Sequence, residues 1–120
     1  MCAVPSVDAR FWIESVPILH AVVVVDLSTQ GGPKEVSRVV LDQQLHPHWT
    51  SYDPQTRRVA VSGYEESGFY LPTFDPASGK VAIDRLFHDG TGQPGFDTGP
   101  RPWPHSWKGG AEVHGIVFSK

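Results

Sequence analysis

The chain has 120 residues, which is the length of a single domain. Hydrophobic residues make up 39% of it and charged residues 19%, so the composition supports a folded core and excludes an intrinsically disordered chain. The formal net charge is −3, and Arg57-Arg58 is the only adjacent pair of basic residues, so no basic stripe is present to bind nucleic acid.

In chain order, residues 1–17 carry no clear pattern and are expected to be irregular. Short runs rich in β-branched residues follow, and each is typical of a β-strand. Turn sequences separate these runs. Asp53-Pro54 and Asp75-Pro76 each begin a turn, because aspartate accepts hydrogen bonds within its own turn and proline fixes φ. The strands are predicted at Ala21–Asp26, Val36–Leu41, Trp49–Asp53, Arg58–Gly63 and Val81–Phe87.

Two features interrupt this pattern. Pro72 lies within the aromatic-rich segment Gly68–Asp75, and because proline lacks a backbone N–H it predicts a bulge or the end of strand pairing there. Residues 90–111 form a long Gly- and Pro-rich insertion that carries two tryptophans and His105. Solvated linkers rarely carry two tryptophans, so we expect this loop to pack on the strands, either as an aromatic cover or as a lid that contacts a ligand.

An internal repeat organises residues 18–120. The segments Val22–Leu41 and Tyr70–Phe87 share the order strand, aspartate, glycine turn, strand. Four strands in a unit of roughly 40–50 residues is the period of a β-propeller blade. The predicted fold class is therefore all-β: a partial β-propeller of antiparallel four-stranded blades. We expect one complete blade and parts of two others, divided as the end of one blade at 18–44, a complete blade at 45–89, the insertion at 90–111 and the first strand of a next blade at 112–120.

Two short stretches carry a family resemblance. In His46-Pro47-His48-Trp49 a blade opens with Pro-His, and Ala60-Val61-Ser62-Gly63 follows an Asp-Pro turn, in the place of the Tyr-Val-Thr-Asn motif. With these residues the chain resembles the YVTN-type β-propeller superfamily, which includes lactonase-like and selenium-binding-protein-like families. The resemblance implies a C-terminal fragment of about two blades, completed by missing blades of a parent chain or by self-association, since a closed propeller needs at least about four.

The apolar runs and the N-terminal sequence indicate where in the cell the protein is expected. The longest apolar run, Val16 to Val25, is interrupted by Pro17 and His20 and is too short for a membrane span. No basic region precedes an apolar stretch at the N-terminus, so we expect no signal peptide, and the cytoplasm is the default expectation. Cys2 is the single cysteine, so no internal disulfide can form.

Histidines are the main candidates for chemistry. His46 and His48 lie on the same side of an extended chain. His114 occupies the matching position of the next repeat, and the resemblance implies that this end of the strands lines the mouth of a central channel. Because imidazole is a common ligand of Zn²⁺ and Cu²⁺, His48 and His114 are the predicted metal ligands of a transition metal. The predicted ligand-binding residues are His48, His114, His46, Trp49 and His105.

Several functions stay open from the sequence. One is the binding of a small molecule, with or without a metal, at the channel mouth of a lactonase-like or selenium-binding-like parent, with His48 and His114 as ligands or as general acid–base groups. The alternatives are a non-catalytic interaction module and a truncated, inactive gene product. A repeated Pro-His also fits a purely structural role at the start of each strand. No nucleophile elbow, phosphate loop or dinucleotide fingerprint is present, so the sequence does not decide whether the chain is an enzyme.

Overall fold

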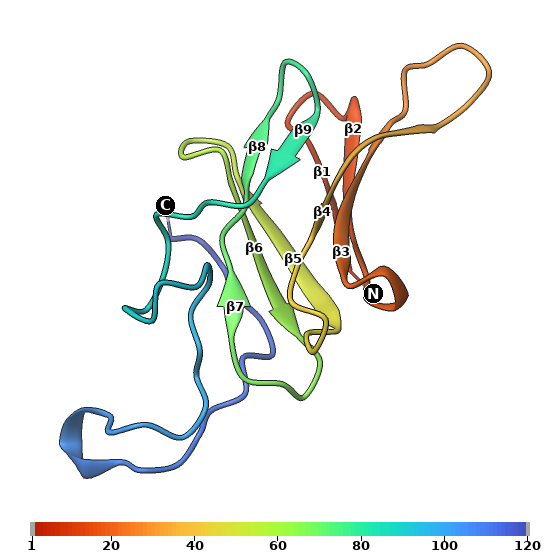
Figure 1. Cartoon of the computed structure of the whole chain (residues 1–120). Helices are drawn as coiled ribbons and strands as arrows, with labels where there is room; N and C mark the ends of the chain where they lie inside the picture. The colour runs from red at the N-terminus through yellow and green to blue at the C-terminus, as the bar shows by residue number, and fades with distance from the viewer. Residues whose placement is uncertain (1, 120) are drawn as a thin grey trace.

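A computed structural model of the chain describes residues 2–119 and consists of two antiparallel β-sheets (Figure 1). The first sheet has four strands in chain order: β1 (Ala3–Pro5), β2 (Phe11–Val16), β3 (Ala21–Asp26) and β4 (Lys34–Val40). The second sheet contains β5 (Pro47–Asp53), β6 (Arg58–Gly63), β7 (Phe69–Tyr70), β8 (Thr73–Asp75) and β9 (Lys80–Ala82). Two short 3-10 turns are η1 (Pro17–Leu19) and η2 (Pro104–Ser106). The predicted all-β class is confirmed.

The hydrophobic core lies between the two sheets. β1 and β2 pack against β5, and β3 and β4 pack against β9. Side chains alternate across each strand, so one row from every central strand enters this interface. The rings of Phe11 and Phe74 meet edge to face across this interface, with centroids 5.8 Å apart. At most 1% of each of these core residues is exposed: Phe11, Ile13, Val22, Val24, Val59, Val61 and Phe74.

The N-terminal segment corrects one expectation. Residues 1–17 were expected to be irregular, but within the described part they contain β1 and β2. In β2 the residues Phe11, Ile13 and Ser15 are fully buried, and Trp12 between them is 37% exposed. This alternation of buried and exposed residues is typical of a strand with one buried face. The polar residues of the run hide the alternation in the sequence. The first sheet is therefore a complete four-stranded meander, whereas only the last two strands of a blade were expected at 18–44.

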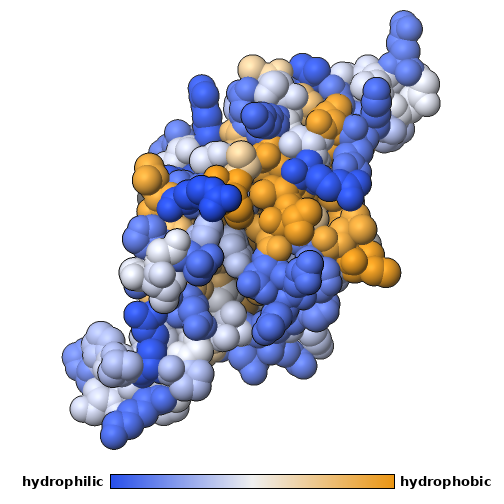
Figure 2. All heavy atoms as spheres, viewed as in Figure 1, coloured by the Kyte–Doolittle hydropathy of each residue, from blue (hydrophilic) through white to orange (hydrophobic). Residues whose placement is uncertain are grey.

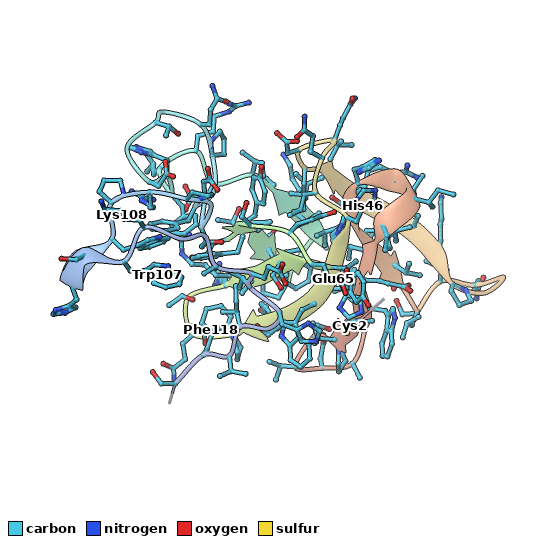
Figure 3. All side chains as sticks on the ribbon, turned by 90° about the horizontal axis from the view of Figure 1, so that it is seen from below. Cys2, His46, Glu65, Trp107, Lys108 and Phe118 are labelled. Carbon is cyan, nitrogen blue, oxygen red and sulfur yellow. The ribbon has the colours of Figure 1, made fainter. Side chains whose placement is uncertain are left out.

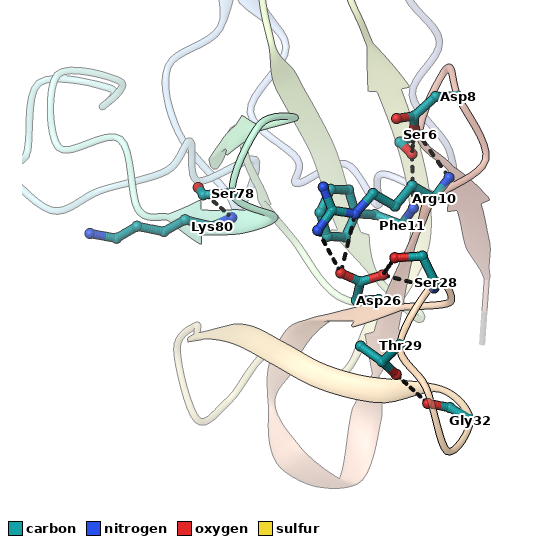
Figure 4. Close-up of polar contacts among 10 residues, drawn as sticks. All are labelled: Ser6, Asp8, Arg10, Phe11, Asp26, Ser28, Thr29, Gly32, Ser78 and Lys80. Carbon is teal, nitrogen blue, oxygen red and sulfur yellow. Dashed lines mark hydrogen bonds and ion pairs between the residues drawn. The ribbon is translucent and has the colours of Figure 1, made fainter.

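A charged cluster closes one end of the core (Figure 4). Arg10 donates to Asp26 Oδ2 through Nε and Nη2, at 3.2 and 2.9 Å, and its guanidinium carbon lies 4.6 Å from the centroid of the Phe11 ring. Ser28 donates to Asp26 Oδ1 from its backbone N and from Oγ. The hydrogen bonds from Arg10, followed by those from Ser28, lower the pKa of Asp26 to about 2. The ion pair therefore stays charged at neutral pH.

The interruption at Pro72 is confirmed. Pro72 falls between β7 and β8, where the strand breaks, and its carbonyl still accepts a hydrogen bond from the backbone N of Val59 at 2.9 Å. The last strand is shorter than the predicted Val81–Phe87, because β9 ends at Ala82. Residues 84–87 then form a turn in which the Asp84 carboxylate accepts from the backbone N of Leu86 at 2.9 Å.

The 90–111 loop packs at its base and extends at its tip. The ring of Phe96 stacks on Phe69 of β7 with centroids 5.6 Å apart, and Thr98 is buried beside them. The tip carries η2 and projects away from both sheets (Figure 1), and Trp107 there is 59% exposed. The expected packing on the strands therefore holds for the base of the loop and not for its tip.

The segment after the insertion crosses the second sheet without being a strand. Residues 112–119 have no assigned strand, although the first strand of a next blade was expected at 112–120, and Lys120 lies outside the described residues. The segment is held instead by side chains of β5, which donate to its backbone. In the described part of the chain, no helix has the length and apolar character that a membrane span requires.

Candidate functional site

Four histidines gather at one end of the sheets, where β2 turns into β3, where β5 begins and where β6 ends. Figure 3 looks onto this end, with His46, Glu65 and Cys2 on the side of the molecule opposite Trp107 and Lys108. The histidines form two pairs. The ring centroids of His48 and His114 are 5.8 Å apart, and those of His20 and His46 are 5.0 Å apart.

His48 is the second residue of β5 and lies at a bulge. The register with β6 shifts between the residues on either side of it, so His48 is the extra residue of the ladder. A bulge re-aims the side chain of the extra residue relative to the regular alternation. The centroid of the His48 ring lies 5.2 Å from that of Tyr64 and 5.8 Å from that of His114. The proximity predicted for His48 and His114 is thus present.

The Nδ1 atom of His48 is buried and has no hydrogen-bond partner within residues 2–119. Burial, with a smaller contribution from His114, lowers the pKa of the His48 imidazole below its usual value of 6.5. The ring is therefore neutral at pH 7 and keeps one nitrogen lone pair for a ligand or a proton. A buried polar atom without a partner costs about 1–3 kcal/mol, so stability alone does not explain this residue.

His114 comes from the segment that crosses the second sheet, and polar side chains of the sheet fix this segment. Trp49 Nε1 and Ser51 Oγ both donate to the carbonyl of Ile116, at 3.0 and 2.7 Å. Ser62 Oγ donates to the carbonyl of His114 at 3.3 Å. Trp49 was predicted to bind ligand, and its indole N–H is used here to hold the segment that carries His114.

His20 and His46 each use Nδ1 for a hydrogen bond. The Nδ1 atom of His20 lies 2.9 Å from the carbonyl of Leu45, and that of His46 bonds to Oε1 of Glu66. The second carboxylate oxygen of Glu66 accepts from the backbone N of His46 at 2.6 Å. Neither His20 nor Glu66 was predicted as a site residue. They lie in loops of different sheets, and no local sequence pattern indicates that such loops meet.

A groove of about 640 Å³ includes Glu66 in its wall. The other walls come from the turn before β5, from β7 and from the 90–111 loop, so rings of Phe69, Tyr70 and Phe96 line it together with several carboxylates. Grooves of this size hold small molecules. The described lining contains no histidine, but it includes Leu45 and Glu66, which are the hydrogen-bond partners of His20 and His46.

His105, which was also predicted to bind ligand, lies apart from the other histidines. It lies in η2, at the tip of the 90–111 loop, and Figures 1 and 3 both place this tip far from the start of β5. The loop tip closes on itself, because Trp103 Nε1 donates to the carbonyl of Gly109 at 2.8 Å. Among residues 2–119, no group of three or more His, Cys, Asp and Glu side chains is placed to hold a metal ion.

Comparisons with known proteins identify no relative. No protein-family model matches the chain, and neither a curated protein nor a solved structure matches it.

Proposed function

We propose that the chain is part of a β-propeller-type assembly that binds a small molecule, with or without a metal ion, where His48 and His114 lie. The observation that carries this proposal is the buried Nδ1 of His48, which has no partner in the described chain and lies beside a second imidazole. Buried polar atoms are almost always hydrogen-bonded, and a ligand is one way to supply the missing bond.

The spacing of this pair also suits a metal ion. Two imidazoles bound to one tetrahedral Zn²⁺ have ring centroids roughly 5 Å apart, because each Zn–N bond is about 2.0 Å long. The centroids of His48 and His114 are 5.8 Å apart, which a small rotation of either side chain would reduce. Two protein ligands leave coordination positions open, and a small molecule or water would occupy them.

Replacing His48 or His114 by alanine is expected to remove the metal that this pair binds. After loading with Zn²⁺ and dialysis, the metal content measured by mass spectrometry should fall by about one equivalent in each variant, because each loses half of the protein ligands. His88→Ala is the control, since His88 is an exposed histidine outside both pairs. Unchanged metal content in both His48→Ala and His114→Ala would exclude the ligand role.

The outer face of the first sheet supports the assembly part of the proposal. Side chains alternate across a strand, so Trp12, Val23 and Val25 lie on the face turned away from the core. The same face carries Glu14 and the ion pair of Glu35 with Arg38. Val40 of β4 shares this face and is 58% exposed. Figure 2 shows apolar side chains gathered on the side of the molecule where β3 and β4 lie. The opposite face of this sheet is already covered by a second sheet, so a further antiparallel sheet from a second copy of the chain fits here.

We expect the purified chain to form a particle larger than one chain, measured by light scattering after size-exclusion chromatography. Val40→Lys should reduce this association, because burying an unpaired ammonium in the apolar contact is costly. Val7→Lys is the control, because Val7 is 79% exposed and lies in a turn outside the sheet face. A compact, stable monomer of the unaltered chain would contradict the assembly.

A further inference from the structure

The hydrogen bonds that His20 and His46 make through Nδ1 determine which nitrogen of each ring carries the proton. A backbone carbonyl can only accept, so the Nδ1–H of His20 donates to Leu45. The carboxylate of Glu66 accepts from the Nδ1–H of His46 in the same way. In a neutral imidazole a proton on Nδ1 leaves the lone pair on Nε2. Within residues 2–119, neither Nε2 atom makes a hydrogen bond.

Histidines that bind metal ions share this hydrogen bonding of the second ring nitrogen. In such sites the ring nitrogen away from the ion donates to a carbonyl or a carboxylate, which orients the ring and raises its basicity. His20 and His46 have ring centroids 5.0 Å apart. Two imidazoles on one tetrahedral Zn²⁺ require roughly 5 Å, given Zn–N bonds of about 2.0 Å. The side chain of His46 is 55% exposed, so solvent ions reach the pair.

The backbone at His20 gives separate support. His20 follows η1 with φ 48° and ψ 40°, in the left-handed region that favours glycine. A non-glycine residue in this region costs about 1 kcal/mol or more. The residue is held there, because its N–H donates to Pro17 at 3.0 Å and its carbonyl accepts from Leu41 at 2.7 Å. The first sheet thus holds an imidazole at a position where the backbone conformation is less favourable for histidine than for glycine.

We propose that His20 and His46 bind a divalent transition-metal ion of the Zn²⁺, Co²⁺ or Cu²⁺ class, and that Glu66 orients His46 for this role. Imidazole suits these ions, whereas Ca²⁺ and Mg²⁺ require oxygen ligands. His20 belongs to the turn between β2 and β3, and His46 precedes β5, so the ion joins the two sheets at their end. Water fills the remaining coordination positions. This site is separate from the pair of His48 and His114 and does not depend on the proposed function.

The test uses Co²⁺ as the probe, because its visible absorption reports nitrogen ligands and coordination geometry, with Zn²⁺ as the competitor. In the full chain at about pH 7.5, where free imidazole is neutral, His20→Asn and His46→Gln should each lower the affinity for Co²⁺ at least about tenfold. Asparagine tolerates the left-handed backbone, and glutamine keeps a donor for Glu66, so both variants are expected to fold. Glu66→Gln should lower the affinity by about tenfold while nitrogen ligation remains visible in the spectrum.

A second measurement separates this site from the other pair. In a chain carrying His48→Ala, so that the other pair binds no ion, saturating Zn²⁺ should raise the Tm by roughly 5–10 °C, because the ion binds both sheets only in the folded chain. Adding His20→Asn to this variant should abolish the rise. His48→Ala and His114→Ala should keep it. If His20→Asn and His46→Gln bind Co²⁺ as the unaltered chain does, the proposal is wrong. If His48→Ala alone loses the ion, the metal belongs to the other pair, and this proposal fails while the proposed function stands.

Discussion

Replacing Phe11 by alanine is expected to lower the free energy of unfolding by about 3–5 kcal/mol. Phe11 is 0% exposed, and its ring lies edge to face against Phe74 of the other sheet. It also fills the space over Gly79, where a Cβ atom would lie 2.5 Å from the ring. The substitution therefore opens a cavity between the two sheets, and the loss is a large fraction of the about 5–15 kcal/mol that stabilises a typical domain.

Urea unfolding followed by circular dichroism measures this effect. Val7→Ala is the matched control, because Val7 is 79% exposed in a turn and its truncation should change the free energy of unfolding by less than about 0.5 kcal/mol. A loss below about 1 kcal/mol for Phe11→Ala would mean that the sheets do not share the core described above.

The turns were the most predictable part of the fold. Asp53 accepts from the backbone N atoms of Gln55 and Thr56, and Asp75 accepts from the backbone N of Ala77 and from Ser78 Oγ. These bonds confirm the turn-capping interpretation of both aspartates. They were predictable because a turn is decided by residues two or three apart in sequence, and aspartate and proline impose it locally.

The first two strands were less predictable for a physical reason. β1 has only three residues, and the run of β2 mixes Glu14 and Ser15 with apolar residues. Ser15 is nevertheless fully buried, because its Oγ is hydrogen-bonded to Thr50 Oγ1 of β5. A polar residue at a core position becomes acceptable only through a partner on another sheet, and that partner is separated by 35 residues.

The candidate site also has one feature that the sequence predicted and others that it did not. The proximity of His48 and His114 was expected from the repeat, but residues 112–119 bring His114 there as an irregular segment and not as the strand that the repeat predicts. The pairing of His20 with His46 depends on how the β2–β3 turn meets the residue before β5, which no repeat encodes. The bulge at His48 depends on a register shift against β6, which the hydrophobic pattern of the two strands does not indicate.

Replacing His48 by phenylalanine is expected to raise the stability of the metal-free chain and to abolish binding at the pair with His114. Phenylalanine keeps a ring against Tyr64 and removes the buried Nδ1 that has no partner in the described chain. Removing an unsatisfied buried polar atom should increase the free energy of unfolding by about 1 kcal/mol, measured by urea unfolding in EDTA. The affinity of the pair for Zn²⁺ should fall by more than the roughly 10–100-fold that loss of an outer hydrogen-bond partner costs.

A gain in stability together with a loss of Zn²⁺ binding distinguishes a functional residue from a structural one. A residue kept for stability loses stability when replaced, whereas a residue kept for binding gains stability and loses its ligand. His105→Phe is the control, since His105 lies exposed at the loop tip and should change neither quantity. If His48→Phe destabilises the chain and leaves Zn²⁺ binding unchanged, then His48 supports the start of β5 and the binding proposal for this pair is wrong.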